Sequence, residues 1–153
     1  MPITMKDVRA RLDPDEVDYL EARKLGPRAI PFLLELVQGG DLGLASKAAY
    51  LASTILSARS TAVLETAAAS KEAVVRVAAA SGLRNLSEKD AEKVMDLMKN
   101  DPDAGVRKVL VKSVSALKSA RLAAKVREMA EQDPEPFVRD LAASSVKKMK
   151  KKK

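Results

Sequence analysis

The sequence contains no cysteine, no histidine and no tryptophan, and only two tyrosines and two phenylalanines. Without cysteine and histidine there are no disulfides, no thiolate nucleophiles, no zinc sites of the Cys/His type and no histidine general bases. A phosphate-binding loop is also missing, because the glycine-rich stretch 39–43 lacks the Lys-Ser/Thr pair that such a loop needs. We therefore expect a protein that is not an enzyme and that has no cofactor and no metal site.

The composition instead favours packed helices. Hydrophobic residues make up 46% and charged residues 32% of the 153 residues, so the chain has enough apolar side chains for a core. Alanine, leucine, valine, lysine and glutamate dominate, and these are residues of high helix propensity or small size. We expect an all-α protein.

The net charge of +7 is concentrated at one end of the chain. Residues 147–153 hold six of the 28 basic residues, which leaves 22 basic against 21 acidic residues in the first 146. No window of about 18 uncharged apolar residues is present, and the first residues have no apolar signal-peptide region. We expect a cytoplasmic protein without a membrane span.

A repeat of about 31 residues runs through most of the chain. Leu44, Val75, Val106 and Val138 follow one another at intervals of 31, 31 and 32 residues, and the positions four, eight and eleven residues later are also apolar. These offsets lie on one face of a helix, and the position seven residues on is small in three repeats, which favours close helix packing. The apolar columns are Ala48, Ala79, Leu110, Ala142; Ala52, Leu83, Val114, Val146; and Ile55, Leu86, Leu117, Met149, and the mostly small column is Leu51, Gly82, Ser113, Ser145.

A shorter apolar segment precedes each of these helices, so each repeat is a helical hairpin. The predicted architecture is a right-handed α-solenoid of stacked hairpins in a single domain, residues 1–149. Its parts are N-terminal capping helices in 1–26, repeats in about 27–57, 60–87, 88–118 and 120–149, and a lysine tail in 150–153.

Helix-start signals support these boundaries. We expect capping at Thr4 with Asp7, at 13–16, at Ser70 and Ser87, and at the Asp-Pro pairs 101–102 and 133–134; Gly26-Pro27 should stop one helix and start the next. Capping also explains the paired carboxylates at these positions without catalysis.

The stretches LGPRAIPFLLELV, DPDAGVRKVLVKSV and DPEPFVRDLAASSV resemble HEAT repeats, especially the short repeats of the phycobilin-lyase-like group. The resemblance covers about residues 26–149 and implies that the second helix of each hairpin lines a concave face. Ala45 departs from the pattern, because the later repeats have arginine there.

The arginines of that column are Arg76, Arg107 and Arg139, and each follows an acid by four residues. Such pairs share a helix face and stabilise it by about 0.2–0.5 kcal/mol each. An anion-binding arginine ladder is the functional alternative. We favour the structural interpretation, with partners Glu72, Asp103 and Glu135.

The surface of the second helices is the candidate binding site. At offsets two, six and nine it carries four basic residues and one acid, Asp140, among mostly serines, which favours an acidic or phosphorylated peptide. Tyr50 is its sole aromatic residue, either a binding anchor or a side chain packed over the neighbouring hairpin. The candidate partner-binding residues are Tyr50, Val77, Arg84, Lys108, Lys112 and Lys147.

The predicted function is non-catalytic protein binding, as an adaptor or scaffold. The first alternative is binding of nucleic acid or an anionic surface by the lysine tail and the basic residues of the concave face. The family resemblance alone implies a third, a bilin lyase or lyase chaperone. The sequence identifies neither the partner nor the oligomeric state.

Overall fold

The computed structural model describes residues 2–151, and the side chains of residues 2–149. Within this part all regular structure is helical, without strands. The α-helices are α1 (Met5–Leu12), α2 (Tyr19–Ala22), α3 (Ile30–Val37), α4 (Leu42–Thr54), α5 (Ser60–Ala68), α6 (Ala73–Gly82), α7 (Glu88–Met98), α8 (Ala104–Ser115), α9 (Ala120–Gln132) and α10 (Pro136–Lys151). Three short 3₁₀ turns join them, η1 (Arg23–Leu25), η2 (Pro27–Ala29) and η3 (Leu83–Asn85).

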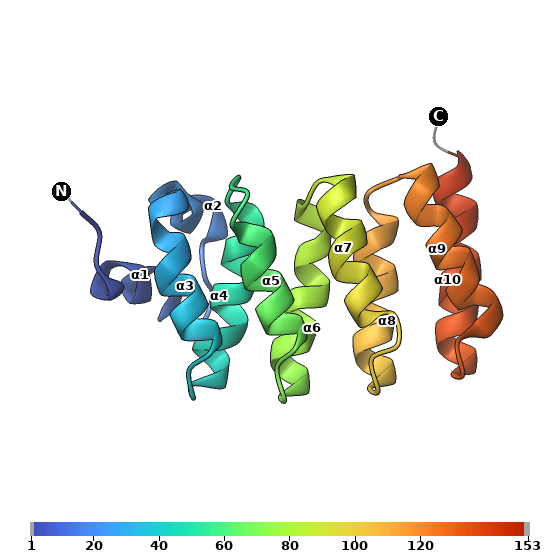
Figure 1. The fold of residues 1–153 in the computed structure, drawn as a ribbon, viewed down its shortest axis with the longest axis horizontal. Coiled ribbons are helices and arrows are strands. Elements are labelled where there is room, and N and C mark those ends of the chain that lie inside the picture. Colours follow the sequence, from blue (N-terminus) through green and yellow to red (C-terminus); the bar gives the residue numbers. More distant parts are fainter. Residues whose placement is uncertain (1, 152–153) are drawn as a thin grey trace.

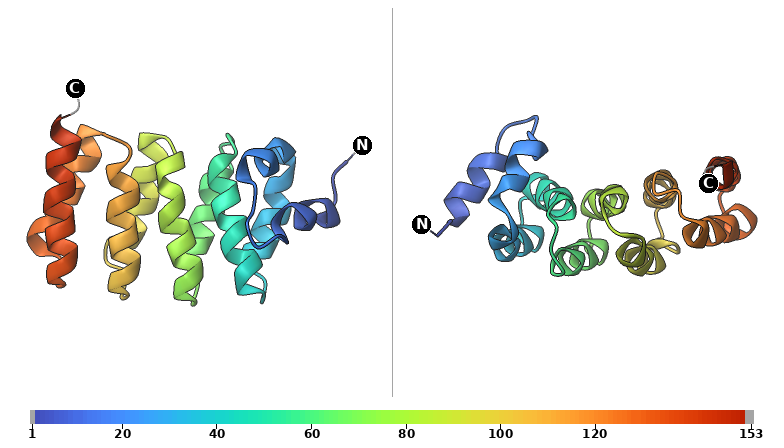
Figure 2. Two further views of the ribbon diagram at one scale, coloured as in Figure 1. Left: turned by 180° about the vertical axis from the view of Figure 1, so that it is seen from behind. Right: turned by 90° about the horizontal axis from the view of Figure 1, so that it is seen from above.

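The helices α3 to α10 form four antiparallel hairpins stacked side by side in two layers (Figure 1). The first helices, α3, α5, α7 and α9, make one layer, and the second helices, α4, α6, α8 and α10, make the other (Figure 2). The second helices pack closely on one another, whereas α7 and α9 make little backbone contact. The closer layer lies on the inner side of a shallow curve (Figure 2). This confirms the predicted α-solenoid.

The core follows the predicted columns. The column that begins with Leu44 is buried in all four hairpins, and so are the columns four and eight residues later, the last of which ends at Val146. In the column at offset eleven, Ile55 and Met149 are buried, and Leu86 and Leu117 are partly buried against the core. Each hairpin therefore buries its apolar face against its neighbours, as expected for stacked repeats.

The column of small residues lets the second helices approach closely. A Cβ added at Gly82 would lie 2.8 Å from the Cβ of Ser53 on the preceding second helix, closer than two such atoms pack. One repeat further, the Ser113 hydroxyl accepts the backbone N–H of Arg84 at 2.9 Å and donates to the Ser81 carbonyl at 3.0 Å. The small residues therefore serve both close packing and polar contacts between hairpins.

Some predicted caps are present and others are wrong. Thr4 and Asp7 form a capping box on α1, and Ser87 caps α7. Residues 13–16 do not start a helix, because α2 begins later, with Asp18 as its N-cap. Asp101 and Asp133 are not the N-caps either: Asp103 caps α8, and α10 begins at Pro136.

The N-terminal segment packs on the first hairpin. Helix α1 contacts α3 and α4, and α2 contacts α4. The ammonium of Lys47 on α4 donates to the carbonyls of Leu12 and Pro14 at 3.0 and 2.9 Å, which fixes the segment that leaves α1. Gly26, with φ of 73°, separates η1 from η2 as predicted. In the part of the chain that the structure describes, none of the helices combines the length and the apolar character needed to span a bilayer.

Candidate functional site

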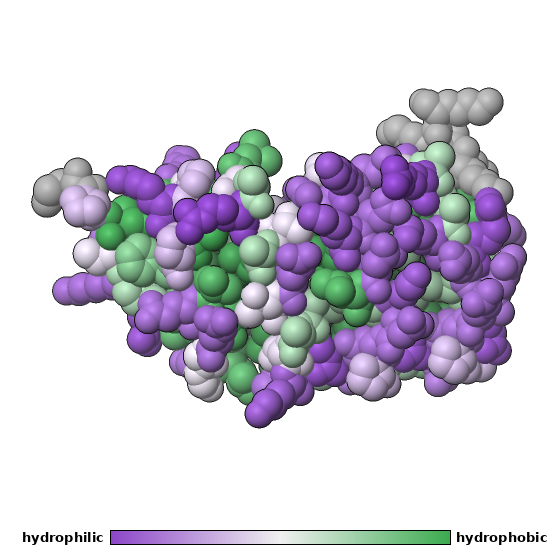
Figure 3. Space-filling model, in the orientation of Figure 1, coloured by the Kyte–Doolittle hydropathy of each residue, from purple (hydrophilic) through white to green (hydrophobic). Residues whose placement is uncertain are grey.

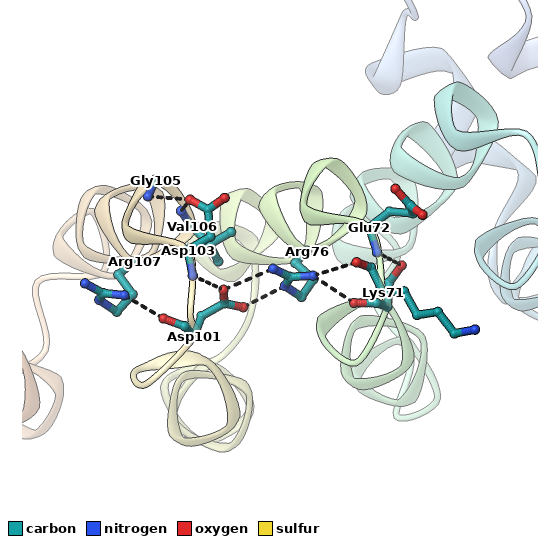
Figure 4. Close-up of polar contacts among 9 residues, drawn as sticks. Lys71, Glu72, Arg76, Asp101, Asp103, Gly105, Val106 and Arg107 are labelled. Atoms are coloured by element: carbon teal, nitrogen blue, oxygen red, sulfur yellow. Dashed lines mark hydrogen bonds and ion pairs between the residues drawn. The ribbon is translucent and has the colours of Figure 1, made fainter.

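Two arginines of the repeat column, Arg76 and Arg107, each join two successive hairpins. Nε of Arg76 donates to Asp101 at 2.8 Å and Nη2 donates to the second oxygen of the same carboxylate at 3.3 Å. Nη1 points the other way, to the carbonyls of Ser70 and Lys71 in the arginine's own hairpin (Figure 4). Arg76 thus connects the α5–α6 loop to the α7–α8 loop.

Arg107 repeats this arrangement one hairpin further along. Nε and Nη2 donate to the Asp133 carboxylate at 2.8 and 3.1 Å, and Nη1 donates to the Asp101 carbonyl at 2.6 Å. The two side chains are 8% and 2% exposed. The hydrogen bonds to Asp133 raise the pKa of Arg107 above its ordinary value, against the opposing effect of burial.

The predicted partners of these arginines were wrong. Glu72 and Asp103 lie four residues before Arg76 and Arg107, but their carboxylates point away from the guanidinium groups (Figure 4). The Asp103 carboxylate accepts backbone N–H groups of α8, which is the role of a cap. The true partners, Asp101 and Asp133, come from the next hairpin, so Arg76 and Arg107 link successive hairpins.

The two aspartates also order their own loops. Asp101 accepts the backbone N–H of Asp103 at 2.9 Å, and Asp133 accepts that of Glu135 at 2.9 Å. In the corresponding loop of the second hairpin, the Ser70 hydroxyl accepts the N–H of Glu72 at 3.1 Å. Ser70 carries no charge. In the preceding hairpin, the position of the arginine column is occupied by Ala45, which is fully buried. The hairpin that follows Ala45 therefore has no aspartate at the loop position that Asp101 and Asp133 occupy in the later hairpins.

The predicted partner-binding residues all lie on the second helices or directly after them. Arg84, Lys108, Lys112 and Lys147 are exposed, whereas Val77 and Tyr50 are half-buried. We call the surface formed by Val77, Ser81, Arg84, Lys108, Lys112, Asp140, Ser144 and Lys147 the second-helix face. Ser53 was expected there too, but it is 2% exposed, because its hydroxyl bonds to the Tyr50 carbonyl and receives the side-chain amide of Asn85.

The basic side chains of the second-helix face have no acidic partner. Arg84, Lys108, Lys112 and Lys147 make no side-chain hydrogen bond or ion pair within the described residues. This leaves their charges available to a ligand.

Several charges of the first-helix layer are paired instead. Glu92 on α7 pairs with Arg121 and Lys125 of α9 at 2.8 and 3.4 Å, and Asp96 pairs with Lys125 at 2.6 Å. The hydrogen bond to Asp96 raises the pKa of Lys125. On this side the surface over α7 and α9 is mostly hydrophilic, and hydrophobic residues are more frequent over α3 and α5 (Figure 3). These ion pairs link α7 to α9 at the surface.

Tyr50 lies where α2 meets the first hairpin. Its ring meets that of Tyr19 edge to face, with centroids 4.9 Å apart. Burial, with a contribution from Tyr50, raises the pKa of Tyr19. The two rings line a cleft of about 370 Å³ together with Leu20, Arg23 and Leu56, and the two leucines are 69% and 92% exposed. Tyr50 therefore packs on the N-terminal segment and still borders a surface cleft.

The lysine tail is described only in part. Lys147 and Lys148 are exposed on α10, and the backbone of α10 remains helical to Lys151. The side chains of residues 150–151, and residues 152–153 altogether, lie outside the described part of the chain. Among the described side chains, no three carboxylates come close enough together to hold a metal ion.

Fold and contacts define this protein as an α-solenoid of short helical hairpins. The sequence pattern of HEAT repeats matches residues 60–147, more than half of the chain, and the chain belongs to this family. A search of curated proteins gives no match.

Among solved structures, the chain is similar to one from "The structure of the complex of CpcE and CpcF of phycocyanin lyase from Nostoc sp. PCC7120". The TM-score is 0.68 at 21% sequence identity, over 92% of this chain and 96% of that chain. This likeness supports the fold over nearly the whole length.

Proposed function

We propose that this protein is a non-catalytic protein-binding module that takes an acidic partner on its second-helix face. The observation that carries the proposal is a group of exposed basic residues on three adjacent second helices that have no acidic partner among the described residues: Arg84 after α6, Lys108 and Lys112 on α8, and Lys147 on α10. Asp140 is the one acid of this face.

The spacing of these residues suits an extended acidic segment. Lys108 and Lys112 lie one helical turn apart on the central helix of the face, so both can contact the same segment. Helices α6 and α10 pack on either side of α8, which places Arg84 and Lys147 on its two flanks. The small serines between them leave room for a backbone. Complementary charge of this kind raises specificity and the rate of association.

Charge reversal on α8 tests the proposal. A fluorescently labelled peptide of eight glutamates is titrated by anisotropy against the wild-type protein and the Lys108→Glu/Lys112→Glu variant. We expect the variant to bind at least about tenfold more weakly, because two attractive contacts become repulsive, and tenfold corresponds to about 1.4 kcal/mol.

The matched control is Lys89→Glu/Lys93→Glu on α7, which makes the same change in net charge at two exposed lysines with the same spacing. We expect the control to change the affinity less than about threefold at physiological salt, where distant charges are screened. Equal weakening by both variants would mean that the peptide responds only to net charge, and would end the proposal.

Nucleic acid or an anionic surface is the second candidate ligand. Lys147, which belongs to the second-helix face, and Lys148 are both exposed near the end of α10. If the six lysines of 147–153 all met DNA phosphates, the logarithm of the affinity would fall with the logarithm of salt at a slope of about −5. Duplex DNA in the same titration, with and without residues 150–153, distinguishes the candidates.

A lyase-related role is a third candidate, supported by the fold shared with a chain of the phycocyanin lyase complex. Ultraviolet-visible spectra of the protein mixed with a bilin pigment test it. An unchanged pigment spectrum would remove this candidate.

A further inference from the structure

Arg139 makes only one of the two kinds of contact that the other two arginines of its column make. Its Nη1 donates to the carbonyl of Asp133 at 2.6 Å, as Nη1 of Arg107 does to Asp101. In Arg76 and Arg107, Nε and Nη2 together hold a carboxylate of the next hairpin. Within the described residues, Nε and Nη2 of Arg139 have no such partner.

The guanidinium group of Arg139 is nevertheless held in the bridging position. The bond to the Asp133 carbonyl fixes one end of the group, and the side chain is only partly exposed. A planar guanidinium fixed at one edge presents Nε–H and one N–H of Nη2 as a fork that matches a carboxylate. Little side-chain entropy remains to be lost when a carboxylate binds there.

The column itself indicates what the fork binds. Both arginines that precede another hairpin have an aspartate opposite them, in the loop between its two helices. Where the column has Ala45 instead, the loop opposite has Ser70. Arginine and aspartate thus occur together, and the fork of Arg139 fits the same ligand.

Small exposed side chains also lie on the α9–α10 hairpin. Val111 on α8 is buried, and the residue in its register on α10 is Ala143, which is exposed. Ala120 and Ala124, in the first turns of α9 at the end of the hairpin away from Arg139, are exposed as well. These small side chains allow the close approach that the internal hairpins make.

We propose that Arg139 binds an aspartate in a loop of a partner protein, which packs on the α9–α10 hairpin as another repeat would. A second copy of this chain fits poorly, because the loop of its first hairpin has Gly39 in the place of the aspartate. Helix α1 also packs on that first hairpin. This site does not involve Lys108 or Lys112, so it can fail or hold independently of the second-helix face.

The test follows the Nε–H signals of the arginines by NMR in the full chain. We expect slow water exchange of the Nε protons of Arg76 and Arg107 and fast exchange of that of Arg139. The probe is a synthetic peptide copied from residues 129–138, which contains the Asp133 loop. Its addition at millimolar concentration should shift the Arg139 signal, and the Asp133→Asn form of the peptide should shift it much less.

Two protein variants complete the test. Arg139→Lys keeps the charge but removes the fork, and should weaken binding of the peptide by about fivefold to tenfold. Arg59→Lys, at an exposed position just before α5 and far from the α9–α10 hairpin, should leave binding unchanged. No shift of the Arg139 signal, an equal response to both peptides, equal effects of the two variants, or sedimentation that shows self-association through Arg139 would each overturn the proposal.

Discussion

Replacing Arg107 with methionine is expected to lower the free energy of unfolding by about 3–5 kcal/mol, because it leaves a buried carboxylate without its counter-charge. Asp133 would keep the backbone N–H of Glu135 but would lose both guanidinium bonds, at a side chain only 2% exposed. The Asp101 carbonyl would also lose its donor. Urea unfolding followed by circular dichroism measures the change.

Arg139→Met is the matched control, since Arg139 occupies the same position in its hairpin and, among the described residues, bonds only to the Asp133 carbonyl. We expect this change to cost about 1 kcal/mol, the value of an ordinary hydrogen bond. Adding Asp133→Asn to the Arg107→Met variant should recover part of the loss, because the buried charge is then removed. Equal losses for Arg107→Met and Arg139→Met would show that the contact between hairpins contributes nothing to stability.

Replacing Leu83 with alanine should cost about 2–5 kcal/mol, the range for a large aliphatic side chain removed from a packed core. Leu83 is completely buried where α6 passes into η3, so a cavity would remain between hairpins. Thermal melting gives the comparison with the control below.

Ser115→Ala is that control, on the second helix of the next repeat. The Ser115 hydroxyl donates only to the Lys112 carbonyl one turn earlier, and the side chain is partly exposed. We expect a change within about 0.5 kcal/mol. If Ser115→Ala were the more damaging change, the assignment of buried and exposed helix faces would be wrong.

The fold could be predicted from the sequence because the hydrophobic pattern repeats at a constant interval. The same apolar position recurs in each repeat, at Val75, Val106 and Val138. Such recurrence means that every repeat has the same two helices, and identical repeats are expected to stack. The same alignment predicted the close approach at Gly82, because the column that contains it is mostly small.

The partners of the arginines could not be predicted from helix geometry. The rule for residues four apart considers one helix, whereas the Asp101 carboxylate reaches Arg76 across a hairpin boundary. A signal was present, since aspartates stand 25 and 26 residues after Arg76 and Arg107. Both aspartates stand in Asp-Pro pairs, which are typical of helix starts. They were therefore predicted to be helix caps and not partners of the arginines. The contact between Tyr19 and Tyr50 has no repeat to predict it, because Tyr19 lies outside the array.

The most direct test of an acidic partner on the second-helix face is amide NMR of the 15N-labelled chain, titrated with the eight-glutamate peptide at physiological salt. We predict chemical-shift changes in α8 around Lys108 and Lys112 and in the adjoining residues Val77 to Arg84, with small changes in α7 and α9. Changes confined to α7 and α9, or to the lysines beyond Val146, would contradict the account.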